Sequence, residues 1–162
     1  MAIRIFVTGG TFDKEYDEIK EQLVFLETHV PQMLKLGRCK IDISLRTLML
    51  IDSLQMTEAD RHIMLENCKK AEEDKIVITH GTSTVAETAT FLGKHVKNKT
   101  IVLTGAMSPY TFGSSDGLFN LGCALAFVQT LPHGVYVAMN GRYFAANNVR
   151  KNAKTGVFEE IR

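Results

Sequence analysis

Threonine hydroxyls close to glycines are the groups of this chain best suited to nucleophilic chemistry. In three places an apolar, β-branched run closes on a threonine and a glycine-bearing turn, at residues 5–11, 76–82 and 101–106. Thr11 and Thr82 each follow a glycine directly. A threonine hydroxyl attacks well when a base takes its proton, and a lysine with a lowered pKa is one such base. The structural alternative is that these threonines only cap helices or turns, where Thr is favoured.

The elements that carry these turns decide whether the turns can act together. Short runs of Val, Ile and Leu are typical of buried strands in a parallel sheet. Ligands of open α/β sheets bind beyond the carboxyl ends of such strands. We therefore expect the three turns to meet at one site.

Strands and helices alternate along the chain, which predicts an α/β fold. After the first strand, further strands are expected at 40–45, 75–79, 100–103 and 134–139. Helices are expected around 21–35, from Thr57 with Asp60 in its first turn, from a capping box at Thr84–Glu87, and from about Ser115 with Asp116 as its cap.

Other segments give weaker signals. Residues 13–20 are charged and are expected to form a loop, and the polar tail 141–162 a hairpin or an arm that reaches a neighbouring subunit. The inner face of the helix from Thr57 is expected to comprise Ala59, Ile63, Cys68 and Ala71, and that of the next helix Val85, Ala89, Leu92 and Val96. His80 is interpreted as a framework residue of its turn.

Composition restricts the class of protein. The 162 residues, 45% of them hydrophobic, are enough for one sizeable core and one domain. A net charge of +1 gives no indication of the concentrated basic surface that nucleic-acid binding requires. Three isolated cysteines and scattered histidines indicate neither disulfides nor a metal site. With no targeting or membrane segment visible, we expect a cytoplasmic protein.

Several motifs together resemble those of the bacterial-type L-asparaginase/glutaminase family. They are Thr8-Gly9-Gly10-Thr11, Thr79-His80-Gly81-Thr82-Ser83-Thr84, Glu87-Thr88-Ala89, Gly105-Ala106-Met107-Ser108-Pro109 and Ser115-Asp116-Gly117-Leu118-Phe119-Asn120-Leu121. The similarity spans nearly the whole chain, in the family's order, and covers the larger N-terminal domain only. Residues 1–162 are thus expected to be a single N-terminal-like domain without the family's C-terminal domain.

This resemblance implies a three-layer α/β/α fold with a largely parallel, flavodoxin- or Rossmann-like sheet. It also implies a homo-oligomer, dimer or tetramer, that acts on a small amide without cofactor or metal, and with neither nucleic acid nor membrane as partner. By position in the motifs, Thr11 is the nucleophile, assisted by Tyr16 from the following loop. Thr82 works with Lys151 as a second catalytic pair.

Substrate contacts are implied in the same way. Ser53 falls where the family holds the substrate carboxylate, and Ala106 where a backbone carbonyl faces the scissile amide. Backbone N–H groups at the Gly10 and Gly81 turns would hold the oxyanion. Ser83 stands where the family usually has an aspartate that binds the α-ammonium group, and Asp13 is a conceivable substitute acid.

The leading functional hypothesis is hydrolysis of L-asparagine to L-aspartate and ammonia through a threonine acyl-enzyme. Two alternatives remain open. Ser83 favours a hydrolase of a different small amide on the same scaffold. The missing C-terminal domain favours a catalytically degenerate ligand-binding or regulatory module.

Overall fold

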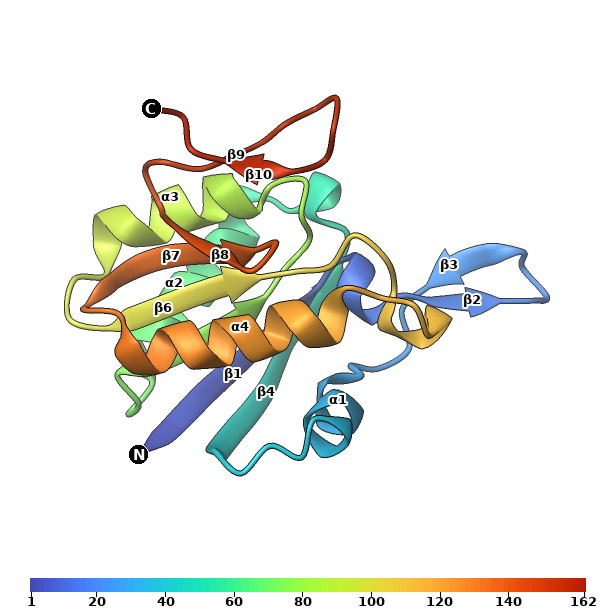
Figure 1. Ribbon diagram of the computed structural model, residues 1–162, viewed down its shortest axis with the longest axis horizontal. Coiled ribbons are helices and arrows are strands. Elements are labelled where there is room, and N and C mark those ends of the chain that lie inside the picture. The colour runs from blue at the N-terminus through green and yellow to red at the C-terminus, as the bar shows by residue number, and fades with distance from the viewer.

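Five parallel strands and one antiparallel edge strand form the central sheet of the computed structural model, which describes residues 1–162 (Figure 1). The strand order is β4-β1-β5-β6-β7-β8. The parallel strands are β1 (Ala2–Gly9), β4 (Asp42–Ile51), β5 (Lys75–Thr79), β6 (Thr100–Thr104) and β7 (Gly134–Met139), and β8 (Arg142–Ala145) runs antiparallel to β7. The parallel strands follow the flavodoxin-like order 2-1-3-4-5. The predicted α/β fold with a largely parallel sheet is confirmed.

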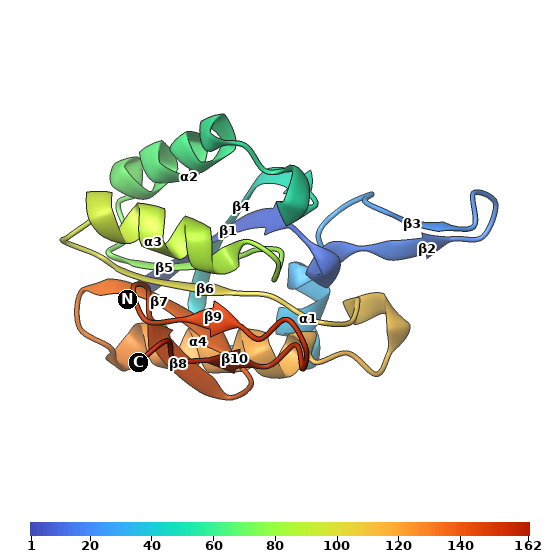
Figure 2. The same ribbon diagram turned by 90° about the horizontal axis from the view of Figure 1, so that it is seen from above.

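Helices cover both faces of this sheet (Figure 2). On one face lie α2 (Glu58–Lys70) and α3 (Val85–His95), and on the other α1 (Val30–Leu36) and α4 (Gly117–Thr130). Alternate strand residues supply two cores: Ile76 and Ile78 pack on the α2/α3 side, and Val77 on the α1/α4 side. Side chains of a buried parallel strand are apolar on both faces for this reason. The three-layer α/β/α arrangement is confirmed.

The connection through α4 has the opposite hand to the other three crossovers. The α3 and α4 connections both advance by one strand in the same direction, yet Ile101 and Leu103 face the α3 side whereas Val102 faces the α4 side. The α1 connection runs the other way across the α4 face, so its hand matches that of α2 and α3. Because about 98% of parallel crossovers are right-handed, the α4 connection is the left-handed one. Its loop, residues 105–116, carries the chain from the carboxyl edge of the sheet to the α1 face.

The predicted helix at 21–35 is wrong over most of its length. Residues 15–24 form a hairpin of β2 (Glu15–Asp17) and β3 (Gln22–Val24), and it projects from the body (Figures 1 and 2). Glu21 adopts the left-handed conformation, with φ +53°, at the turn. Helix α1 begins only at Val30, with Pro31 in its first turn, where a proline fits. The charged segment 13–20 is therefore partly strand rather than loop.

The buried face of α2 also differs from expectation. Met64, Leu65 and Cys68 are buried together with Arg61, whereas Ile63 is 46% exposed. The prediction is confirmed for Cys68 and for Ala71, which is partly buried against this core, and is wrong for Ala59 and Ile63, which are exposed. Arg61 is buried since it has a polar partner across the helix interface, Thr88 of α3.

Helix starts were predicted with mixed success. The Thr57–Asp60 capping box of α2 is formed, and the buried face of α3 is as predicted. Thr84 does not cap α3, because its hydroxyl donates instead to the carbonyl of Ser53 at 3.0 Å.

Three short 3₁₀ turns and a C-terminal hairpin complete the chain. The turns are η1 (Thr11–Asp13), η2 (Ser53–Gln55) and η3 (Tyr110–Phe112). In the tail, β9 (Arg150–Lys151) pairs with β10 (Phe158–Glu159), so the hairpin alternative is the observed one. Phe158 is fully buried and fixes this hairpin to the body. No helix has both the length and the apolar content needed to cross a bilayer.

Replacing Thr57 by Ala is expected to lower the free energy of unfolding by about 1 kcal/mol, because the Asp60 amide loses its cap. The measurement is urea denaturation followed by circular dichroism. Thr57→Ser retains the hydroxyl and should remain within a few tenths of a kcal/mol of the parent. Equal losses in both variants would contradict the capping role.

Candidate functional site

The ends of β1 and β5 meet at the point where the strand order reverses. From β1 the chain goes to β4 on one side, and it returns to β5 on the other. Here Gly10 packs against Gly81 backbone to backbone: a Cβ added to Gly10 would lie 2.4 Å from the Gly81 Cα, and Gly10 has φ +74°. Only glycine fits at Gly10 for both reasons. Thr11 and Thr82, which follow these glycines, therefore start from one shared rim of the sheet.

Thr82 and Lys151 are in direct contact. The Lys151 Nζ donates a hydrogen bond of 2.8 Å to the Thr82 Oγ1. Lys151 forms no ion pair, and Glu159 of the facing strand pairs with Arg150 at 2.9 Å. The pairing of Lys151 with buried Phe158 across the tail hairpin sets its position. The structure thus brings together two residues that are 69 positions apart in the sequence.

Ser53 packs against the same turn. Its Oγ would lie only 2.5 Å from a Cβ on Gly81, and it accepts a hydrogen bond of 3.3 Å from the Thr84 amide. Ser53 is 2% exposed, whereas Ser83 is exposed to solvent. The β1, β5 and η2 turns therefore form one contiguous surface.

The loop after β6 closes this surface on its other side. A Cβ on Gly105 would lie 2.4 Å from the His80 carbonyl oxygen and 3.2 Å from the Thr82 Cγ2. Ala106, next in the chain, is buried. Asn120 was not singled out by the sequence, although its Nδ2 donates to the Gly105 carbonyl at 2.8 Å and fixes the backbone before Ala106. The sequence signal that could have identified this residue is a single asparagine within a largely apolar helical segment.

Asp116 holds the same loop together. Its carboxylate accepts hydrogen bonds of 2.9–3.1 Å from the amides of Met107 and Ser108. The predicted capping of α4 by Asp116 is wrong, because its side chain makes no cap bond; Ser115 Oγ accepts from the Gly117 amide instead.

Tyr16 is not brought into hydrogen-bond contact with Thr11. It lies in β2 of the projecting hairpin and its side chain is 53% exposed (Figure 1). At the base of this hairpin, Lys14 forms an ion pair of 2.8 Å with Asp52, the residue before Ser53. The Lys14 hydrogen bond lowers the pKa of the Asp52 carboxyl. Sequence reasoning missed this pair, since nothing local links residues 14 and 52.

Asp13 lies inside the fold. It is fully buried, and its Oδ1 accepts hydrogen bonds from the His29 amide at 2.8 Å and from the Thr28 hydroxyl at 3.1 Å. Burial raises the pKa of this carboxyl in spite of those bonds. The idea of Asp13 as a substitute acid for an ammonium group is therefore wrong, because its carboxylate ties η1 to the start of α1.

His80 is a framework residue, as predicted. Its Nδ1 lies 2.8 Å from the Gly81 carbonyl oxygen and its Nε2 2.8 Å from the Thr88 Oγ1. Burial, together with the Arg61 cation, lowers the pKa of His80 to about 4. The ring is therefore neutral at physiological pH.

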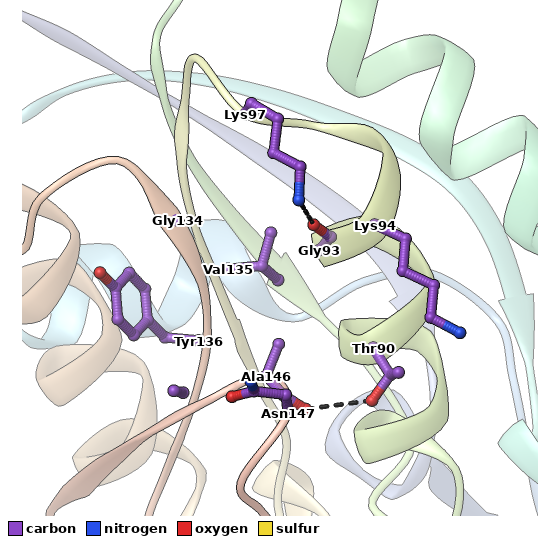
Figure 3. Close-up of a pocket in the computed structure, with 10 residues that line it drawn as sticks. Thr90, Gly93, Lys94, Lys97, Gly134, Val135, Tyr136, Ala146 and Asn147 are labelled. Carbon is purple, nitrogen blue, oxygen red and sulfur yellow. Dashed lines mark hydrogen bonds between the residues drawn. The ribbon is translucent and has the colours of Figure 1, made fainter.

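A separate cavity of about 370 Å³ opens between the carboxyl-terminal half of α3, the first residues of β7 and the segment after β8 (Figure 3). It lies at the amino end of β7, and none of the predicted site residues lines it. The Lys97 ammonium is bonded to the Gly93 carbonyl, and that of Lys94 points outward (Figure 3). This cavity has no part in the threonine site.

Known proteins match this chain in sequence and in structure. The family model described as asparaginase, N-terminal, matches residues 2–159. L-asparaginase 2 of Escherichia coli K12 is 34% identical over 169 residues, which cover 96% of this chain and 47% of that protein.

Solved structures agree with the sequence match. The thermostable L-asparaginase from Thermococcus kodakarensis has a TM-score of 0.88 at 30% identity, covering 99% of this chain and 51% of that one. A probable cytoplasmic L-asparaginase from Campylobacter jejuni has a TM-score of 0.84 at 32% identity, covering 98% and 52%. The chain thus spans about half the length of the relatives it matches.

The buried His80 predicts a pH-dependent stability. Its folded pKa of about 4 lies below the ordinary value of 6.5, so the unfolded chain binds the proton more tightly. The contribution of His80 is complete above pH 6.5 and is lost as the pH falls toward 4, by about 3 kcal/mol. Urea denaturation between pH 4 and 7.5 measures it. In His80→Asn this part of the pH slope should disappear; an unchanged slope would contradict the assignment.

Proposed function

This chain belongs to the asparaginase family, and from that premise we propose that it is an amidohydrolase that converts L-asparagine to L-aspartate and ammonia through a threonine nucleophile. The observation that carries the proposal is the 2.8 Å bond between Lys151 Nζ and Thr82 Oγ1, next to the turn that bears Thr11. A lysine that has no ion-pair partner and is hydrogen-bonded to a threonine hydroxyl can take part in proton transfer.

In the first proposed step, the Thr11 Oγ attacks the carbon of the substrate's side-chain amide. A C–O bond forms, the carbonyl electrons move to oxygen, and the hydroxyl proton passes to the leaving nitrogen. Ammonia departs when the C–N bond breaks, leaving an ester on Thr11. Water then hydrolyses this ester and releases the carboxylic acid.

Thr82 and Lys151 serve the hydrolysis of the ester in this proposal. Because Lys151 Nζ donates to the Thr82 oxygen, the Thr82 hydroxyl proton is directed to another acceptor. The Thr82 hydroxyl can therefore orient the attacking water. Backbone N–H groups of the two glycine turns would hold the oxyanion, each worth about 3 kcal/mol of barrier.

The remaining site residues are proposed to bind substrate. The Ser53 hydroxyl would donate a hydrogen bond to the substrate carboxylate, and the Ala106 carbonyl would face the amide nitrogen. Ser83 lies on the exposed side of the turn, where it would meet the substrate's amino end. Tyr16 would reach Thr11 only after the projecting hairpin folds down over the site.

A second candidate function is hydrolysis of a small amide that lacks an ammonium group. The nearby acids are already engaged: Asp13 is buried, and Asp52 is paired with Lys14. Ser83 offers a neutral hydroxyl instead of a carboxylate. A charged hydrogen bond contributes about 1.5–3 kcal/mol, against about 1 for a neutral one, so an amino acid gains little over its deaminated analogue.

The nucleophile assignment predicts that Thr11→Ala and Thr82→Ala each lower the rate of ammonia release from asparagine on the order of 10³-fold or more. Lys151→Met should have a comparable effect, because Thr82 loses its partner. Thr130→Ala and Lys154→Met, at exposed positions, are the matched controls and should retain parental rates. Equal, negligible release by the parent and all variants would refute the hydrolase and favour a degenerate binding module.

Substrate choice is tested by comparing asparagine with succinamate, its analogue without the amino group. If the second candidate is correct, the parent has similar kcat/KM for both. Ser83→Asp should then raise the preference for asparagine about tenfold, whereas Ser83→Asn, which has no charge, should not. A parent that strongly prefers asparagine would eliminate the second candidate.

A further inference from the structure

A buried chain of hydrogen bonds links α2 to the turn that carries Thr82. The Arg61 Nε donates to the Thr88 Oγ1 at 3.0 Å, and this oxygen lies 2.8 Å from the His80 Nε2. The His80 Nδ1 lies 2.8 Å from the Gly81 carbonyl oxygen. Arg61 is 6% exposed, and Thr88 and His80 are fully buried. The residues come from α2, α3 and the end of β5, so they tie three elements together.

The donors and acceptors of this chain allow one arrangement of protons. A carbonyl oxygen only accepts, so the His80 Nδ1 carries the proton that it shares with Gly81. Since the ring is neutral, its Nε2 is an acceptor. The Arg61 Nε only donates, so Thr88 accepts from Arg61 and gives its own proton to His80. The other acceptor near this hydroxyl is the Met56 sulfur, a weak one at 3.7 Å.

This arrangement determines the direction of one peptide group. The His80 ring holds the Gly81 carbonyl, and the peptide between Gly81 and Thr82 is trans. In a trans peptide the C=O and N–H groups point in opposite directions, so the Thr82 N–H points away from His80. That N–H has no hydrogen-bond acceptor within the chain.

We infer that Arg61, Thr88 and His80 are positioning residues, which hold the Gly81–Thr82 peptide with its N–H free to bind the substrate's developing oxyanion. The inference rests on the proposed function, because it supplies that reaction with a fixed donor. A preorganised donor contributes most when it does not have to reorient during the reaction.

Arg61 is suited to the outer end of this hydrogen-bond chain. Its remaining nitrogens lie 3.6 Å from Glu58 and 3.5 Å from Glu87, two exposed carboxylates. These pairs hold the guanidinium in place while its Nε faces inward. A permanent cation there also opposes protonation of His80, which would turn Nε2 into a donor and break the bond from Thr88.

The first experiment compares Thr88→Val with Thr88→Ser in ammonia release from asparagine. Valine has the shape of threonine but cannot bridge Arg61 and His80, so kcat should fall at least tenfold with KM within about twofold. Serine keeps the hydroxyl and should restore kcat to within about threefold. Equal kcat in Thr88→Val and the parent, or no rescue by serine, would overturn the inference.

The second experiment separates the two ends of the His80 ring and does not depend on the valine variant folding. Asparagine at position 80 places an amide nitrogen near the position of Nδ1 and can still donate to Gly81. Glutamine reaches the position of Nε2 and leaves the Gly81 carbonyl unbound. We expect His80→Asn to retain at least fivefold more kcat than His80→Gln at matched thermal stability. The reverse order, or equal rates, would contradict the role of the Gly81 carbonyl.

A third measurement is independent of catalysis. Nitrogen-15 NMR of the parent should show His80 as the neutral tautomer protonated at Nδ1. An Nε2-protonated or cationic ring would overturn the inference whatever the activity. If the parent shows the expected tautomer but releases no ammonia, the proposed function fails, while the hydrogen-bond chain from Arg61 to Gly81 is still supported.

Discussion

The close approach of two glycine backbones, at Gly10 and Gly81, is the constraint on which the rest of the site depends. A side chain on Gly10 would collide with Gly81, and one on Gly81 would collide with Ser53. This contact brings the turns after β1 and β5 to one rim, as expected at the reversal point of a doubly wound sheet. Thr11 and Thr82 follow the two glycines in contact, and the Ser53 side chain packs against Gly81.

The other groups around the Thr82 turn come from the loop after β6, the tail hairpin and the end of β5. The left-handed connection after β6 brings Gly105 and Ala106 against the Thr82 turn and continues to η3, where the Thr111 hydroxyl donates to the Lys14 carbonyl at 3.1 Å. The tail hairpin brings Lys151 from the opposite end of the chain. On the interior side, His80 holds the same turn through its carbonyl. The turn bearing Thr82 is thus held by groups distant in sequence and, from the interior, by its neighbour His80.

Much of this could be predicted from residues alone, because runs such as Ile76–Ile78 are apolar on both faces and end in glycine turns. The pairing of Thr82 with Lys151 followed from family motifs rather than from spacing, since no local rule joins residues 69 positions apart. Patterns failed where polar groups are buried. Arg61 interrupts the apolar stripe of α2, and Asp13, considered as a substitute acid for the substrate's ammonium group, is fully buried.

The contact of Lys151 with Thr82 depends on the tail hairpin. All five parallel strands and all four helices precede residue 140, and Lys151 follows them in the tail hairpin. Buried Phe158 fixes that hairpin to the body, and the hairpin holds the Lys151 ammonium at the Thr82 hydroxyl. A chain clipped after β8 would therefore lose the Lys151 contact with Thr82 together with Val149 and Phe158, two buried residues of the α2/α3-side core.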